Sequence, residues 1–76
     1  MSDLEAERFY LNALYKLRDE NRNIGDDPEK WNEFSEKVGA IVAQAHEYPC
    51  YLIVYGFAFL VLDVTDKENA LKSKNK

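Results

Sequence analysis

The chain has 76 residues, of which 46% are hydrophobic and 32% are charged, and its net charge is -4. A chain of this length forms one small domain, expected to span 1–76. Such a domain buries about 60% of the surface that the unfolded chain exposes, too little for the deep pocket that most enzymes use. The negative charge and the scattered Lys and Arg residues argue against nucleic acid as a partner, because phosphate binding depends on clustered basic residues.

The first predicted element is a helix over residues 3–21. Its apolar residues recur at spacings of three and four, which places them on one face of a helix. Ser2 or Asp3 is expected to cap the amino end, where carboxylates also favour the positive end of the helix dipole. The apolar stripe consists of Ala6, Phe9, Tyr10, Ala13, Leu14 and Leu17.

A polar loop at 21–27 separates this helix from a second one, predicted over residues 28–47. Asp27 is the expected N-cap, and Pro28 suits the first helical position because its missing N–H costs nothing there. Pro49 ends the helix, since it pushes Tyr48 away from helical backbone angles. Joined by the short loop, the two helices predict an antiparallel hairpin whose apolar side needs a cover. The second stripe consists of Trp31, Phe34, Val38, Ile41, Val42 and Ala45.

The third element lies in residues 48–62, YPCYLIVYGFAFLVL, which contain no charged side chain. These fifteen residues are fewer than the ~20 that cross a bilayer, so the run argues against a membrane span. Its many β-branched and aromatic residues favour strand, and Gly56-Phe57 suits a two-residue turn. We therefore expect a β-hairpin over 51–64 that covers the helical hairpin. The alternative is a third helix, which makes the chain an all-α three-helix bundle.

After the hairpin, Thr65 and Glu68 have the spacing of a capping box, which predicts a short C-terminal helix. Residues 72–76, KSKNK, are expected to form a frayed basic tail. The predicted fold class is therefore α+β.

Both faces of the predicted β-hairpin are apolar. Side chains alternate along a strand, so Leu52, Val54, Ala58, Leu60 and Leu62 point one way and the aromatic-rich set points the other. Only one set can pack on the helices, and an exposed apolar patch of this size is typical of an interface. The predicted interface residues are Tyr51, Ile53, Tyr55, Phe57, Phe59 and Val61.

This surplus of apolar surface predicts a protein–protein interaction module that forms a homodimer. One alternative is a small regulator or inhibitor that binds a larger host protein through the same patch. A further alternative is a membrane-associated protein anchored by residues 48–64.

The loop between the helices resembles a calcium site in one respect, because its oxygen-bearing residues alternate as in a calcium-binding helix–loop–helix. Ile24 stands where that motif demands glycine, and Lys30 replaces its bidentate glutamate, so the sequence predicts a polar turn and no metal site. The alternating residues are Asp19, Asn21, Asn23, Gly25 and Asp27.

His46 and Cys50 are close in sequence and are the residue types of a catalytic thiolate–imidazole pair. The intervening proline turn and the apolar run that follows Cys50 predict a buried structural cysteine and a surface histidine. We therefore expect no enzymatic activity, catalytic residue or cofactor. A single cysteine and an acidic amino terminus predict cytoplasmic localisation.

Overall fold

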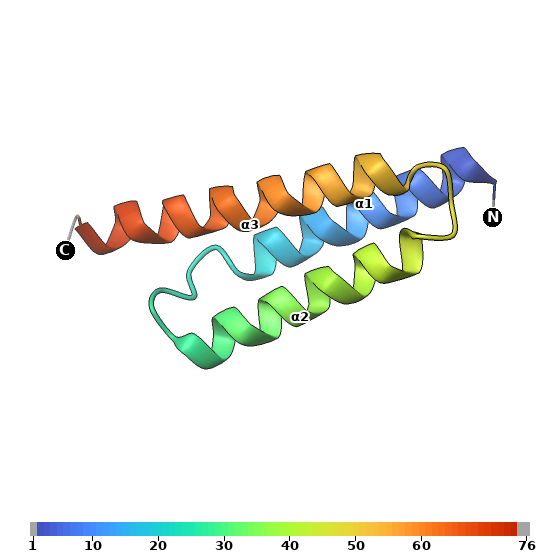
Figure 1. The fold of residues 1–76 in the computed structure, drawn as a ribbon. Coiled ribbons are helices and arrows are strands. Elements are labelled where there is room, and N and C mark those ends of the chain that lie inside the picture. Colours follow the sequence, from blue (N-terminus) through green and yellow to red (C-terminus); the bar gives the residue numbers. More distant parts are fainter. Residues whose placement is uncertain (1, 75–76) are drawn as a thin grey trace.

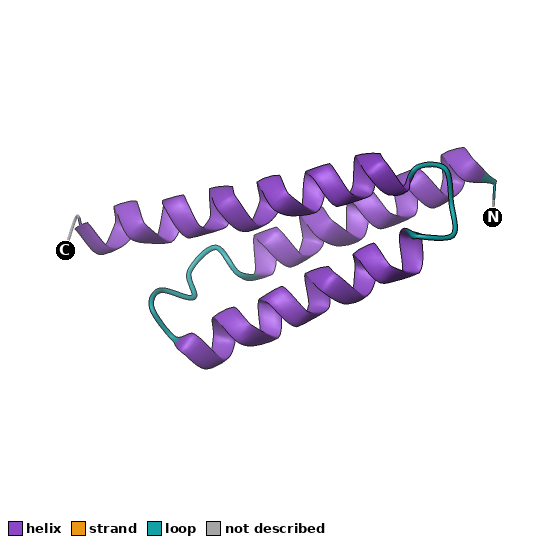
Figure 2. Cartoon of the chain, in the orientation of Figure 1, coloured by secondary structure: helices purple, strands orange, loops and turns teal. Residues whose placement is uncertain are grey.

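A computed structural model describes residues 2–74 of the chain, which form three α-helices. Helix α1 spans Asp3–Glu20, α2 spans Pro28–Ala45 and α3 spans Tyr51–Lys74. The helices run up, down and up, so that α1 and α3 are parallel and α2 is antiparallel to both (Figure 1). The bundle is elongated, with extents of 46 × 19 × 16 Å. Figure 2 shows that helices joined by two loops make up the described part of the chain.

The first two helices confirm the predicted helical hairpin and both of its caps. The Ser2 hydroxyl accepts a hydrogen bond from the Glu5 N–H at 3.2 Å. The Asp27 carboxylate accepts from the N–H groups of Glu29 and Lys30 at 3.0 and 3.4 Å. Each cap pairs amide groups that would otherwise lack partners in the first turn of its helix.

The predicted β-hairpin over 51–64 is wrong, and so is the α+β fold class. Those residues form the amino-terminal part of α3, Gly56 lies inside the helix, and the all-α alternative fits the structure. Thr65 and Glu68 do not begin a new helix, because α3 continues through them to Lys74. A single long helix satisfies its own backbone along the whole groove between α1 and α2, whereas an isolated two-stranded hairpin leaves unpaired edges and is marginally stable.

The core runs along the axis of the bundle, and α3 supplies a regular row of buried side chains to it. The buried positions of α3 are separated by three or four residues, which is the repeat of one helix face. This repeat is hidden in the sequence because the neighbouring positions are apolar too. The row begins at the turn before α3 and consists of Cys50, Val54, Ala58, Val61, Thr65 and Asn69.

The other two helices complete this core with large side chains. Tyr10 and Leu14 of α1 and Phe34 and Val38 of α2 are buried against the α3 row. The Thr65 hydroxyl is buried in the α3 row without a hydrogen-bond partner in the described residues.

Candidate interaction surface

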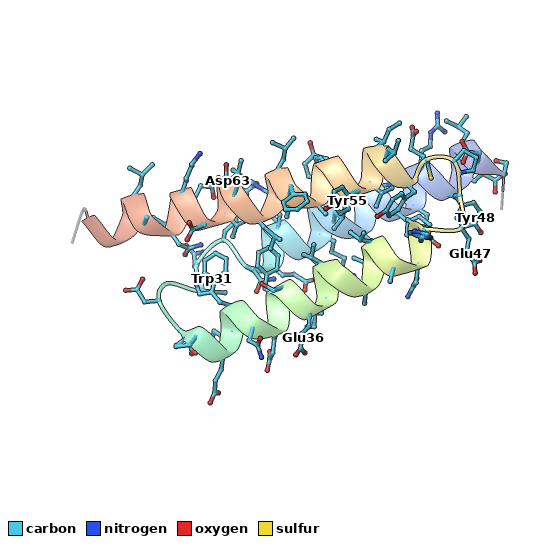
Figure 3. The ribbon with its side chains drawn as sticks, viewed as in Figure 1. Trp31, Glu36, Glu47, Tyr48, Tyr55 and Asp63 are labelled. Carbon is cyan, nitrogen blue, oxygen red and sulfur yellow. The ribbon has the colours of Figure 1, made fainter. Side chains whose placement is uncertain are left out.

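One side of α3 is rich in apolar side chains that the bundle does not cover. Leu52 is 75% exposed, Leu60 is 59% exposed and Phe59 is 57% exposed. Figure 3 shows side chains standing along the outer side of α3, away from the other two helices. We call this surface the α3 face and define it as Leu52, Ile53, Tyr55, Phe59, Leu60 and Val64.

The helix divides the six predicted interface residues among three environments. Ile53, Tyr55 and Phe59 are exposed, whereas Tyr51 and Phe57 are half-buried. Val61 is only 2% exposed and belongs to the core. The alternation expected of a strand therefore places Val61 on the exposed side, whereas the helix buries it.

Sequence reasoning also missed three residues of the α3 face, Leu52, Leu60 and Val64. The predicted β-hairpin places Leu52 and Leu60 on the side opposite the aromatic-rich set. A helical repeat counted from Val54 would have found them, because positions two residues before and six residues after it lie on the opposite side of a helix.

A row of aromatic rings follows the edge of α3 that faces α2. The rings of His46 and Tyr51 are 4.6 Å apart, those of Tyr51 and Tyr55 are 5.7 Å apart, and those of Tyr55 and Phe59 are 4.9 Å apart. Tyr55 lies on the α2 side of the helix (Figure 3). Tyr55 and Phe59 of this row line an open apolar groove of about 190 Å³, whose other residues are Ser35, Val38, Gly39, Val42, Ala58 and Leu62.

The opposite edge of α3 meets α1 in a second shallow groove of about 410 Å³. The rings of Tyr15 and Phe57 lie 4.9 Å apart within it, and Leu60 and Val64 continue the apolar surface outwards. The α3 face is thus bordered on both edges by apolar grooves, and its apolar area extends beyond α3 itself.

Two glycines inside helices, Gly39 and Gly56, have no role in packing within the subunit. Apart from the adjacent residues and the backbone of its own helix, a methyl group placed on either glycine meets no atom of the described residues within 4 Å. Glycine in the middle of a helix destabilises it by about 1 kcal/mol relative to alanine. Gly25 differs, because its φ of 63° is a conformation that other residues rarely adopt.

The loop over residues 21–27, whose sequence resembles a calcium site, forms hydrogen bonds with side chains of α2 and α3. Lys72 donates its ammonium hydrogen bonds to the Arg22 carbonyl at 3.0 Å and to the Asn23 side-chain oxygen at 2.7 Å. The Gly25 N–H donates to Asn69 Oδ1 at 2.9 Å, and Trp31 Nε1 donates to the Gly25 carbonyl at 2.7 Å. A lysine cation from α3 therefore binds oxygens of this loop.

Two other carboxylates of the loop region take part in local structure. Asp19 pairs with Arg22 at 3.0 Å, and Asp27 caps α2. Among residues 2–74, no group of three or more His, Cys, Asp or Glu side chains is placed to hold a metal ion.

At the opposite end of the bundle, Cys50 is buried and His46 is exposed. The Cys50 N–H donates to the Asp3 carboxylate at 3.2 Å, which ties the start of α3 to the start of α1. Burial, followed by the nearby negative charge of Asp3, raises the pKa of the Cys50 thiol above its ordinary value of 9.0. A raised pKa lowers the thiolate fraction and with it the reactivity of the cysteine.

Comparison with known proteins gives no relative, because no family model, curated protein or solved structure matches this chain. Within the described residues, no helix is both long enough and apolar enough to cross a membrane.

Proposed function

We propose that the chain is a protein–protein interaction module that self-associates as a homodimer through the α3 face. The observation that supports this most directly is the crowding of six exposed large apolar side chains into residues 52–64 of one helix. Contiguous apolar patches of this kind mark interaction sites, and aromatic residues are enriched at their centres. The function is binding, without catalysis, and the cytoplasm is the proposed location because the chain carries a single cysteine.

The area available agrees with a dimer interface. The six side chains of the α3 face together expose roughly 600 Å², if a large side chain in full contact buries about 200 Å². Tyr15 and Phe57 in the adjoining groove add to this area. A stable interface of standard size buries about 800 Å² on each partner. The α3 face and its borders are therefore large enough for one second copy of the chain.

The charge distribution is also compatible with self-association. Two copies of an acidic chain repel each other over most of their surface, and buried like charges are costly. No charged residue interrupts α3 before Asp63, so the α3 faces of two copies can meet without placing carboxylates against each other.

Sedimentation equilibrium between about 1 and 200 μM tests the proposal. We expect the mass to rise from one chain to two, with no larger species. Phe59→Glu is expected to weaken the dimer at least about 100-fold, because burying an unpaired carboxylate is strongly unfavourable.

Phe9→Glu is the matched control. Phe9 lies on α1 outside the α3 face and is 54% exposed, close to the 57% of Phe59. This variant should dimerise like the unmodified chain. A folded wild-type chain that stays monomeric throughout the range would contradict self-association. The apolar face would then favour a larger partner protein, as expected of a small regulator or inhibitor.

A further inference from the structure

We infer that the two α3 helices of the dimer cross in an antiparallel orientation at Gly56, with the two-fold axis between the two glycines. This inference rests on the proposed homodimer and specifies the partner surface, which is a second α3 helix in a defined register. Three observations support it: the order of apolar residues around Gly56, the open space at Gly56, and the position of Asp63.

The apolar residues are arranged symmetrically about Gly56. Leu52 and Ile53 precede it by four and three residues, and Phe59 and Leu60 follow it by three and four. All four are large, apolar and at least half exposed. In a two-fold interface the same patch faces itself, and an antiparallel crossing pairs a residue before the axis with one after it. Leu52 then meets the second copy's Leu60, and Ile53 meets its Phe59.

Gly56 supplies the close contact that such a crossing requires. Large side chains stand one turn away on either side, while Gly56 itself is exposed and, apart from the adjacent residues and its own helix backbone, has no atom of the described residues within 4 Å of the position of a Cβ. A glycine at the point of contact lets two helix backbones approach each other closely, and the flanking side chains can then interlock. Nothing within the described subunit gives Gly56 another packing role.

The position of Asp63 favours the antiparallel orientation over the parallel one. Asp63 lies seven residues after Gly56, or about 10 Å along the helix axis, and α3 begins five residues before Gly56. An antiparallel crossing therefore places the two Asp63 carboxylates at opposite ends of the interface, about 20 Å apart along the axis. A parallel crossing places the two Asp63 carboxylates against each other. Lys67 Nζ donates a hydrogen bond to Asp63 Oδ2 at 3.0 Å within the same helix.

Cysteine cross-linking tests the orientation. In a Cys50→Ala background, Leu52→Cys and Leu60→Cys are made as separate proteins, mixed, and treated with a mild oxidant. The antiparallel crossing predicts disulfide-linked heterodimers in the mixture and little linkage in either protein alone. Two equivalent positions lie about 12 Å apart along the axis, beyond the reach of a disulfide. Strong linkage of Leu52→Cys with itself indicates a parallel crossing and overturns the inference.

Glycine substitution tests the point of contact and uses a second helical glycine as its control. Gly56→Ala and Gly39→Ala should both raise the melting temperature of the monomer, because each replaces an exposed glycine inside a helix. We expect Gly56→Ala to raise the dimer Kd at least about tenfold, since an extra methyl group does not fit a close crossing. Gly39→Ala adds its methyl group in the groove beside the α3 face and not at the crossing, so we expect it to change the Kd much less than Gly56→Ala does.

The outcomes separate the two proposals. A wild-type chain that stays monomeric contradicts the proposed homodimer itself. A wild-type dimer whose Kd is the same in Gly56→Ala leaves the homodimer in place and overturns the crossing at Gly56.

Discussion

The two halves of α3 are held in the bundle in different ways. From Tyr51 to Val64 the helix packs through small and medium apolar side chains and leaves large apolar ones exposed. From Thr65 onwards it is held by polar contacts: Asn69 bonds Gly25, Lys72 bonds the loop, and Glu68 forms an ion pair with Arg18.

The difference shows that one helix can combine a half whose rotation is weakly restrained with a half whose rotation and register are fixed. Apolar packing is non-directional, so the first half alone would tolerate rotation or sliding of the helix. Directional hydrogen bonds in the second half fix its rotation and register. The orientation of the α3 face therefore depends on contacts that lie outside it.

The largest expected effect on stability comes from a substitution at Val61, and the same substitution at the neighbouring Leu60 should have little effect. Val61 is 2% exposed and Leu60 is 59% exposed. Val61→Asp should destabilise the chain by at least about 3 kcal/mol, because it buries an unpaired charge. Leu60→Asp should change the stability of the monomer by less than about 1 kcal/mol. Urea unfolding at low micromolar concentration measures both, and equal losses would contradict the assigned rotation of α3.

The anchor in the second half is broken by Asn69→Ala. Asn69 accepts from the Gly25 N–H and donates to the Thr65 carbonyl at 2.9 Å. Its removal leaves a loop amide without its partner, and we expect a loss of about 1–3 kcal/mol together with faster hydrogen exchange at Gly25. Asn32→Ala, at an exposed position of α2, is the control and should leave the exchange of Gly25 unchanged.

A smaller effect is expected from the ion pair between Arg18 and Glu68. Their side chains are 16% and 29% exposed, so solvent screens the pair only partly. Glu68→Gln should cost about 1 kcal/mol and make stability less sensitive to salt. Asp19→Asn breaks the more exposed pair with Arg22 and should cost less than about 0.5 kcal/mol. Thermal unfolding at low and high salt compares the two variants.

The mildest perturbation is alkaline pH, which acts at the amino end of α3. Burial raises the pKa of Cys50 above 9.0, and that of Tyr10 above 10.0, in the folded chain. The folded state then holds these protons more tightly than the unfolded state. Their contribution to stability is complete below about pH 9 and is lost as the pH rises through the folded pKa values. Unfolding measured from pH 7 to 11 should show this decline, and Cys50→Ala should reduce it.

The sequence predicted the parts of the fold whose signals are local. Ser2, Asp27 and Pro28 act within one turn of their own backbone, so both helix starts could be read directly. The third element could not, because residues 48–62 are apolar at nearly every position and therefore match a helix and a strand equally well. Its β-branched residues favour strand only in isolation, and packing in the long groove between α1 and α2 overrides that preference.

The candidate site was predicted at the level of the segment but not of the residue. An excess of apolar surface between 51 and 64 follows from composition in either structure. The helical repeat decides which residues expose this apolar surface. Val61 lies in the core, and Leu52 and Leu60 lie on the surface. The partnership of Lys72 with the loop had no sequence signal, because the two segments are about fifty residues apart and meet only in the folded bundle.

The up-down-up order places the start of α1 and the end of α3 at opposite ends of a bundle 46 Å long (Figure 1). Domains genetically fused to the two ends are therefore held apart by roughly the length of the molecule, as by a stiff spacer. Mechanical tension applied between those ends acts along all three helices and loads their contacts in shear. The chain should accordingly resist stretching better than its small size implies.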